Sequence, residues 1–465
     1  MLRTLLIIPL FTLISSYCFA QNKPSIHIGF SKYYATYDFI QKLSDYYPDN
    51  AYKELFSTSK YNTTKYSDLI SRFDTLDIYA SYNFNGFQVG QKMPGITIHQ
   101  IQRLLIESAD LNDFKTQAFG IVPSSEIYAL ANIIETFLPV YNTLIYEPNK
   151  LNFESKVKDL SRYIDSVNLS GYFQNGLNFY NTNWDYAIPF NITFIPSIEK
   201  NGFTATAFSN QAVSEIQLDF DQYDILFSVL MHEIYHILYD EQNLKYKNEI
   251  NDWFDQSNSN NAQYALLLMN EVLATAIGNG YVYEDLNGVA DSLDWYNMHY
   301  INAMAKKLYP TVKKYILADK SIDQNFINSY LSIYDNEFSS WNIELENLMT
   351  YRYVISEDQD FFDFIRQLYP YSNYRNSDYE LTNNSIEKMM EVPLTKVISI
   401  NNQHKTQLTM ISSNFPELKN WKFNPKKDFI YTTALNDKTK LIIVNAVTRS
   451  AEELWVETFI DGKIP

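Results

Sequence analysis

Residues 230–238 read Leu-Met-His-Glu-Ile-Tyr-His-Ile-Leu, and the rest of the chain is arranged around them. Apolar residues recur around it at three- and four-residue steps, which predicts a helix. On a helix, side chains four residues apart lie on one face, so His232 and His236 point the same way. Two neighbouring imidazoles can bind one Zn²⁺ at roughly 2.0–2.1 Å. Glu233 lies about 100° round the helix, where it can reach a water at the metal without being a ligand.

The spacing His-Glu-x-x-His is typical of metalloproteases, in which zinc lowers the pKa of a water and a carboxylate accepts its proton. The alternative is that both histidines are hydrogen-bonded residues of the protein core. The chain has only six His among 465 residues. A chance occurrence of the motif is therefore uncommon, on the order of one such chain in two hundred. The sequence favours a metal site.

A catalytic zinc takes three protein ligands and leaves one position open for water. Asp240 and Glu241 follow the motif directly, but they fall at the expected end of the helix. Glu271 is the only acidic residue in the apolar run 265–278, which predicts a buried helix. A buried carboxylate needs a partner. For Glu271 that partner is either a metal ion or an Arg or Lys from elsewhere in the chain.

The His-Glu-x-x-His motif, followed by the pair Asn270-Glu271 of an Asn-Glu-x-x-Ala motif, resembles the gluzincin metallopeptidases. This superfamily contains the thermolysin-like enzymes and a group of aminopeptidases. The resemblance implies that one zinc ion per chain is bound by His232, His236 and Glu271. It also implies that Glu233 acts as the general base.

The resemblance covers roughly residues 195–310, about a quarter of the chain, and one feature departs from it. Residues 237–270 separate the second histidine from Glu271, a longer separation than in the familiar gluzincins. The excess, residues 240–263, is polar and rich in Asn and Ser. We expect it to form an inserted helix and an exposed loop.

The resemblance further implies a downstream His or Tyr that stabilises the oxyanion of the tetrahedral intermediate. His299 and Tyr296 are the candidates. A helix is expected over about 291–309, ended or kinked by Pro310. Tyr296 belongs to the apolar stripe of that helix, and His299 lies beside the stripe. The alternative is that Tyr296 is an ordinary core residue and His299 an ordinary surface residue.

The expected fold class is α+β. The chain should be mostly helical, with a small mixed sheet beside the motif helix, as in zincins, and a small C-terminal α/β module. Residues 21–187 should form an N-terminal, mainly helical region, and 188–370 the zincin-like catalytic domain. The C-terminal module should occupy residues 390–465.

Strand signals occur at 190–195 and 204–220, the second alternating cleanly in its last part. The gluzincin resemblance implies that the strand just before the motif helix is the edge of the sheet. A free edge could hold an extended peptide by strand addition, unless the protein itself covers it. Gly278 and Gly280 are the expected stop of the helix that carries Glu271. Helices are expected to continue through about 324–369.

The first twenty residues read as a signal peptide, with a positive start, an apolar core at 5–14 and a small-x-small cleavage site at 18–20. The apolar core is too short to span a bilayer. We therefore expect export to the periplasm or medium and no transmembrane segment in the mature protein. Cys18 leaves a lipoprotein alternative, which the bulky Tyr17 before it disfavours.

The composition narrows the range of partners. The formal net charge of −17 argues against binding nucleic acid or an anionic membrane surface. The chain has one Cys, inside the expected signal peptide, so the exported protein is stabilised without disulfides. An apolar fraction of 46% can supply the necessary core.

Three functions fit these observations. The leading interpretation is a secreted zinc metallopeptidase acting on a peptide or protein substrate. The second is a catalytically inactive relative that binds zinc or peptide. The third is a surface protein that binds glycans through some of its 38 Tyr and 30 Phe, with the motif accidental. Bound zinc separates the third interpretation from the first two, and turnover separates the first from the second.

Overall fold

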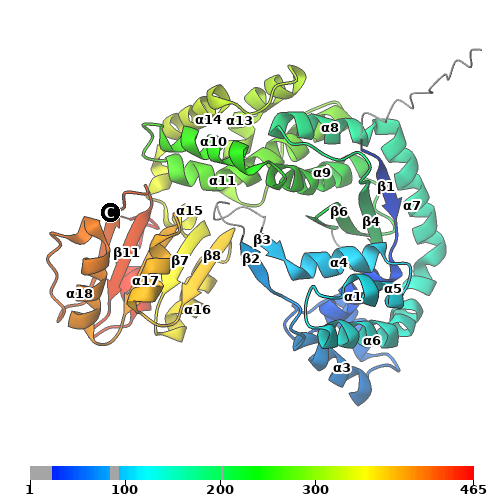
Figure 1. Cartoon of the computed structure of the whole chain (residues 1–465), viewed down its shortest axis with the longest axis horizontal. Coiled ribbons are helices and arrows are strands. Elements are labelled where there is room, and N and C mark those ends of the chain that lie inside the picture. The colour runs from blue at the N-terminus through cyan, green and yellow to red at the C-terminus, as the bar shows by residue number, and fades with distance from the viewer. Residues whose placement is uncertain (1–23, 84–93, 200–202, 465) are drawn as a thin grey trace, which may run out of the picture.

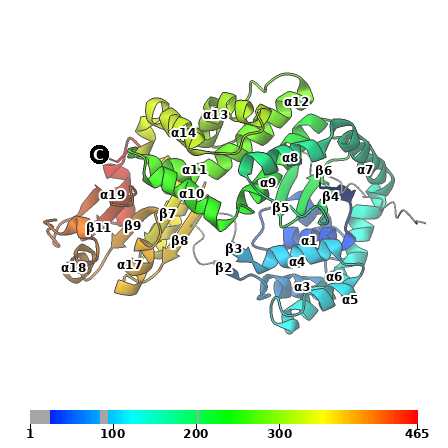
Figure 2. The same cartoon turned by 45° about the horizontal axis from the view of Figure 1, so that its top comes forward.

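The computed structural model describes residues 24–83, 94–199 and 203–464. The expected signal peptide and the lipoprotein alternative at Cys18 fall outside these ranges. Within them the chain is mostly helical, with two small mixed sheets and a short strand pair, so the expected α+β class with a C-terminal α/β module is confirmed. The central helices lie across the top of the views in Figures 1 and 2, with the N-terminal elements below them on the right and the C-terminal module on the left.

Helices form most of the N-terminal region. Their bounds are α1 (Lys32–Leu43), α2 (Ala51–Ser57), α3 (Thr64–Asp74), α4 (Thr97–Glu107), α5 (Leu111–Gln117), α6 (Ser124–Tyr141), η1 (Asn142–Tyr146), α7 (Glu147–Val167) and α8 (Leu169–Tyr180). The strands β2 (Ser81–Asn83) and β3 (Pro94–Ile96) pair with each other. Apolar side chains of α1, α4 and α6 pack together and against Ile195 and Val213 of the first sheet. This core holds the N-terminal helices on the sheet.

The first sheet has the strand order β1-β4-β6-β5. Its strands are β1 (Ile26–Gly29), β4 (Phe190–Pro196), β5 (Thr204–Phe208) and β6 (Gln211–Ile216). The strands β1, β4 and β6 are parallel, and β5 is antiparallel to β6. The expected strand at 190–195 is confirmed as β4.

The strand before the motif helix is not the edge of this sheet, contrary to expectation. That strand is β6, which lies between β4 and β5, and all its residues are buried. The turn Ser209-Asn210 folds β5 back along β6, which places β5 at the edge. The expected alternation also extends too far, because β6 ends at Ile216. A tight hairpin inside the segment 204–220 accounts for the edge position of β5.

The central layer consists of helices. Their bounds are α9 (Tyr223–Asp240), α10 (Leu244–Asp255), α11 (Ala262–Ala274), η2 (Thr275–Val282), α12 (Tyr283–Asn287), α13 (His299–Leu317), α14 (Gln324–Glu337), η3 (Ser339–Asn342) and α15 (Leu345–Thr350). The motif lies on α9, as predicted. The inserted segment after it forms α10 and a short loop, as the polar composition predicted.

Two predicted helix ends are wrong. Gly278 and Gly280 do not stop the helix, because α11 continues through the π-helix η2 into α12. The stop is Gly288, in the left-handed conformation with φ 84°. The helix expected over 291–309 begins at His299 and continues past Pro310 to Leu317. In both places, packing of the helix in the core outweighs the tendency of Gly or Pro to end a helix.

The run Ala262–Asn287, from α11 to α12, is long and apolar enough to cross a membrane by length and composition. It is the one such helix among the described residues. Since 72% of its most apolar window is buried inside the protein, it has the surroundings of a core helix.

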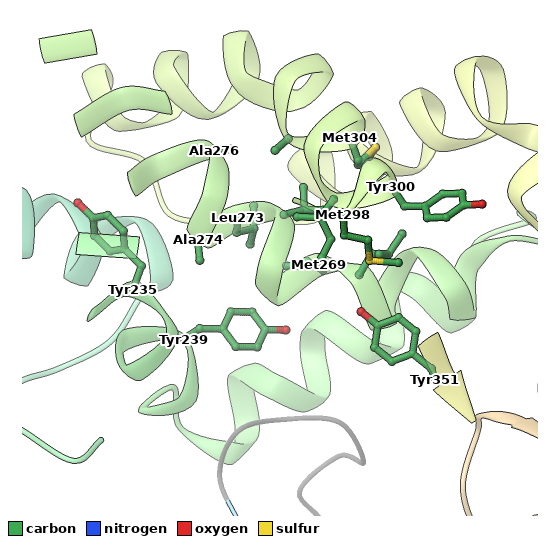
Figure 3. Packing of buried hydrophobic residues seen from close by; sticks show 14 of the residues in the cluster. Tyr235, Tyr239, Met269, Leu273, Ala274, Ala276, Met298, Tyr300, Met304 and Tyr351 are labelled. Carbon is green, nitrogen blue, oxygen red and sulfur yellow. The ribbon is translucent and has the colours of Figure 1, made fainter. Parts of the chain in front are cut away.

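The largest apolar core joins the central helices to the C-terminal module. It contains Leu230 of α9, Leu268 of α11 and Leu308 of α13, together with Trp455 near the C-terminus. Figure 3 shows part of this core, where methionines from α11 and α13 gather and Tyr351 approaches them from the C-terminal sheet. The helix that carries Glu271 is therefore packed on several sides.

The second sheet has the strand order β10-β11-β9-β7-β8. Its strands are β7 (Tyr351–Ile355), β8 (Tyr374–Asp378), β9 (Thr395–Ile400), β10 (Phe429–Ala434) and β11 (Lys440–Asn445). The remaining helices are α16 (Gln359–Leu368), α17 (Asn383–Met390), α18 (His404–Asn414), η4 (Pro416–Leu418) and α19 (Ala451–Thr458). The neighbouring strands are parallel to each other, except that β10 and β11 are antiparallel.

The strand β7 interrupts the run 324–369, which was expected to be helical throughout. Its five residues Tyr-Arg-Tyr-Val-Ile are all buried. Aromatic and β-branched side chains suit such a strand, which is covered on both faces. The C-terminal sheet therefore includes two strands, β7 and β8, that precede residue 390 in the sequence.

Candidate metal centre

The helix α9 places the two histidines of the motif side by side. The Nε2 atoms of His232 and His236 lie 3.1 Å apart. Both residues are buried, with exposed fractions of 5% and 2%. The i, i+4 spacing on an α-helix produces this pairing, because four residues complete slightly more than one turn. Two imidazole nitrogens therefore face one point inside the protein.

The helix α11 brings Glu271 to the same point. Its Oε2 atom lies 3.3 Å from His236 Nε2 and 3.6 Å from His232 Nε2. Glu271 is 4% exposed, so its carboxylate is almost completely removed from water. The apolar faces of α9 and α11 pack in the same core, which sets the position of this carboxylate relative to the imidazoles.

These three atoms fit a metal ion. Their mutual distances of 3.1, 3.3 and 3.6 Å form a nearly equilateral triangle. A point about 2 Å from all three exists, which is the distance that zinc takes from imidazole nitrogen and carboxylate oxygen. The buried carboxylate of Glu271 also supplies negative charge, which a buried cation needs.

The ring of His236 is held by a hydrogen bond on its other side. Its Nδ1 lies 2.8 Å from Asn270 Oδ1. The amide oxygen can only accept, so Nδ1 carries the hydrogen and donates it. The lone pair of His236 is then on Nε2, which faces the site. A partner that fixes the tautomer in this way is typical of metal-binding histidines.

Glu233 lies at the margin of the centre. Its Oε1 atom is 4.0 Å from His232 Nε2, and its side chain is 23% exposed, against 6% for Glu271. Ligand atoms of His232, Glu233 and His236 lie within 4.8 Å of one another, so this group could also hold a metal. Glu271 is nearer to both imidazoles, which favours it over Glu233 as the third ligand. Because the side chain of Glu233 is more exposed to solvent than that of Glu271, Glu233 is better placed to transfer protons.

The other carboxylates considered as ligands lie at the end of α9. Asp240 is the last residue of the helix, and its backbone carbonyl accepts a hydrogen bond from Lys247 Nζ at 2.6 Å. Glu241 follows it and lines a separate surface cleft. Burial raises the pKa of Glu241. Glu271, whose carboxylate lies within 3.6 Å of both imidazoles, therefore remains the candidate third ligand.

Tyr296 reaches the metal centre. Its ring stacks on the His232 ring, with centroids 5.8 Å apart and planes 25° apart. Burial raises the pKa of the Tyr296 hydroxyl, and the carboxylate of Glu271 raises it further. The hydroxyl therefore stays protonated and can donate a hydrogen bond. This placement suits the oxyanion role considered for Tyr296.

His299 lies elsewhere. It is the first residue of α13 and is exposed. Its ring packs beside Tyr300 and Trp341, with centroids 5.4 and 6.1 Å away. Of the two oxyanion candidates, the structure brings Tyr296 to the histidines and leaves His299 at the surface.

Tyr371 is a residue of this site that the sequence did not reveal. Its hydroxyl lies 3.1 Å from the Tyr296 hydroxyl. Burial, Glu271 and Tyr296 all raise the pKa of Tyr371, so it too stays protonated. It belongs to the connection between α16 and β8 of the C-terminal module. No local motif marks it, because its place follows from the second sheet.

The segment around Tyr371 is fixed on both sides. Before it, Trp455 Nε1 donates a hydrogen bond to the Tyr369 hydroxyl at 3.1 Å. After it, the Asn373 backbone N–H donates to Thr350 O at 3.1 Å, and the Asn373 side chain donates to the Tyr351 hydroxyl. The C-terminal module thus holds one side chain at the edge of the metal centre.

Comparisons of the chain with models of protein families, with curated proteins and with solved structures find no match. The function of the protein is therefore inferred from the geometry of the site. That geometry is a buried His232-Glu233-His236 group on one helix that could hold a metal ion, with a second carboxylate and two tyrosine hydroxyls beside it.

Proposed function

We propose that the protein is an exported zinc-dependent metallopeptidase that hydrolyses peptide bonds with Glu233 as general base. One observation carries the proposal: the ring nitrogens of His232 and His236 and a carboxylate oxygen of Glu271 lie 3.1–3.6 Å from one another. Two imidazoles and one carboxylate are a donor set that zinc takes in catalytic sites. The packing of α9 against α11 brings together the three residues that the gluzincin resemblance implies as ligands.

Bound zinc would supply Lewis-acid polarisation of the scissile carbonyl and would lower the pKa of a water. His232, His236 and Glu271 would hold it. The remaining chemistry falls to side chains of this chain. Glu233 accepts a proton from the attacking water and then donates it to the amine that leaves when the C–N bond breaks. The partly exposed position of Glu233 suits a group that must gain and lose a proton in each turnover.

The two tyrosines beside the centre can stabilise negative charge. Tyr296 lies over His232, and Tyr371 is hydrogen-bonded to it. Both hydroxyls keep their protons at neutral pH, because burial and Glu271 raise both pKa values. A positioned O–H donor is the kind of group that stabilises the oxyanion of a tetrahedral intermediate.

The edge strand β5 supports a peptide as the substrate. It packs along α9, and its residues alternate between exposed and partly buried up to Phe208. An extended peptide could add to this edge through backbone hydrogen bonds, which would lay it beside the motif helix. Strand addition recognises the peptide backbone, so it suits an enzyme that acts on unfolded segments.

We further propose that the protein acts in the periplasm or outside the cell, which follows from the expected signal peptide. The net charge of −17 disfavours nucleic acid as a partner.

Metal analysis of purified protein tests the ligand assignment. We expect about one zinc per chain in the wild type and loss of zinc in His236→Ala and in Glu271→Ala, because two ligands hold zinc poorly. A matched control is Glu249→Ala, which removes an exposed carboxylate that pairs with Lys245. Wild type that contains no zinc, and gains no thermal stability when zinc is added, would refute the proposal.

A further inference from the structure

A polar cleft of about 760 Å³ lies outside the metal centre. It is lined by α4 of the N-terminal region, the loop before β4, Asn191 of β4, the turn between β5 and β6, and Glu241 after α9. Glu107 and Asn191 also line a second cleft of about 310 Å³, which continues along β1. The two clefts therefore adjoin at Glu107 and Asn191.

The aromatic residue of this cleft, Trp184, is fixed in place. Its indole Nε1 donates a hydrogen bond to Ile188 O at 2.9 Å. Its ring packs edge-on against buried Phe173, with centroids 5.3 Å apart, and near Phe190. Trp184 remains partly exposed where it lines the cleft. A ligand therefore meets an aromatic surface whose orientation is already set, at low entropic cost.

The guanidinium that lines the cleft is paired with a carboxylate. Arg103 Nη1 lies 2.7 Å from Glu107 Oε2. The other oxygen of Glu107 accepts hydrogen bonds from Gln211 Nε2 at 2.7 Å and from Asn210 Nδ2 at 3.3 Å. The guanidinium already has its counter-charge, so the cleft offers no free cation to a phosphate or a carboxylate. Anionic ligands are poorly matched to it.

The other lining groups are hydrogen-bonding side chains of mixed polarity. They are the amides Gln100, Asn183 and Asn191, the hydroxyl of Ser209 and the carboxylates Asp185 and Glu241. Amides both donate and accept, and carboxylates accept from neighbouring hydroxyl groups. Ser209 has φ 53°, as two-residue hairpin turns commonly require, and the turn presents its hydroxyl at the rim of the cleft.

We propose that this cleft binds a neutral carbohydrate chain. A sugar ring has an apolar C–H face that packs on an indole, and hydroxyl groups around its rim that donate and accept hydrogen bonds. An aromatic surface surrounded by amides, a hydroxyl and carboxylates uses both features of the ring. Neither an apolar ligand nor a polyanion would use the whole lining. The proposal does not depend on the metal centre or on peptide hydrolysis.

Titration calorimetry tests this assignment with the full-length mature protein. The probes are neutral tetrasaccharides, namely cellotetraose, xylotetraose, mannotetraose, maltotetraose and tetra-N-acetylchitotetraose, each up to 10 mM. We expect at least one to bind saturably. Trp184→Ala should weaken that binding at least tenfold, Trp184→Phe should retain part of it, and Gln100→Ala should weaken it about threefold or more.

Two control variants separate the cleft from other effects. Tyr128→Ala removes an aromatic side chain that is 50% exposed on α6, outside the cleft, and should bind sugar as the wild type does. His236→Ala should also keep sugar binding while it loses metal. If Trp184→Ala does not fold, Gln100→Ala alone decides, since it lies on the surface of α4.

Three results would overturn the proposal: no tetrasaccharide binds at 10 mM, binding survives in both Trp184→Ala and Gln100→Ala, or tetralysine binds in a Trp184-dependent way more tightly than any sugar. The last result would assign the cleft to cationic peptides.

Discussion

Gly278 packs directly on the backbone of His232. A Cβ atom at position 278 would lie 2.7 Å from the N, Cα and Cβ atoms of His232, closer than real Cβ contacts allow. Gly278 is part of the π-helix η2, which continues α11 past Glu271. The two elements that supply the candidate metal ligands therefore touch at a point where only glycine fits. Short π-helices inside α-helices are frequent at functional sites, and here one accompanies this close approach.

The first prediction concerns this contact. Gly278→Ala should lower the free energy of unfolding by about 1–3 kcal/mol, because the added methyl meets backbone atoms that cannot move aside independently. It should also weaken zinc binding, because any backbone movement that removes the clash shifts His232 relative to Glu271. Gly29→Ala is the control, because nothing lies within 4 Å of its built Cβ. Thermal unfolding and metal content measured on both variants check the prediction, and equal behaviour of the two would contradict it.

The second prediction concerns Asn270. Asn270→Ala removes the acceptor that holds His236 Nδ1–H and leaves all three candidate ligands in place. Loss of such a partner typically costs 10–100-fold in metal affinity or activity, and we expect about that loss in zinc affinity. Competition with a coloured zinc chelator measures it. An affinity equal to that of the wild type would show that the hydrogen bond does not orient a ligand.

The third prediction concerns the two tyrosines. Tyr371→Phe and Tyr296→Phe each remove one hydroxyl and keep the ring. Each should lower kcat by roughly 10–1000-fold while zinc content and KM change little, as expected for a donor that acts mainly in the transition state. Because the two hydroxyls are hydrogen-bonded, the double variant should lose less than the product of the two single effects. Tyr379→Phe, an exposed tyrosine of the same module, is the control. Unchanged kcat in both single variants would remove the tyrosines from the reaction.

The fourth prediction concerns stability away from the site. Lys42 Nζ of α1 lies 2.7 Å from Asp38 Oδ2 and also contacts Glu215 Oε2 of β6. The side chains of Lys42 and Glu215 are only 8% and 6% exposed. Lys42→Met would leave two carboxylates without their cation, so we expect a loss of about 3–5 kcal/mol in the free energy of unfolding.

The control for this prediction is Lys245→Met. Lys245 is 87% exposed and pairs with Glu249 at the surface, so its removal should cost about 0–1 kcal/mol. Denaturant unfolding compares the two variants. A similar cost for both would show that the buried pair does not anchor α1 to the sheet.

The parts of the site that obey helical periodicity could be predicted from the sequence. The spacing of His232 and His236 fixes their common face, whatever surrounds the helix. Glu271 stood out because a lone carboxylate in an apolar helix requires a partner. The structure places it beside the histidines, across a separation longer than in the familiar gluzincins.

Features that depend on tertiary packing could not be predicted. Gly278 looks like a helix stop in the sequence, but the helix continues past it. Glycine occurs there because the close contact with α9 leaves no room for a side chain. Tyr371 reaches the site through the second sheet, so no spacing in the sequence connects it to the motif. The edge position of β5 depends on the turn Ser209-Asn210, in which Ser209 takes a conformation that its residue type does not suggest.

Hydrolysis of a diverse peptide library by wild type and Glu233→Gln, at equal zinc content, tests the central claim most directly. Glutamine keeps the size and shape of Glu233 but cannot accept the proton. We predict that the variant keeps its zinc and its fold and cleaves at least about a hundredfold more slowly, the low end for loss of a general base. Equal cleavage by the two proteins would contradict the account, as would zinc-loaded wild type that cleaves nothing in the library.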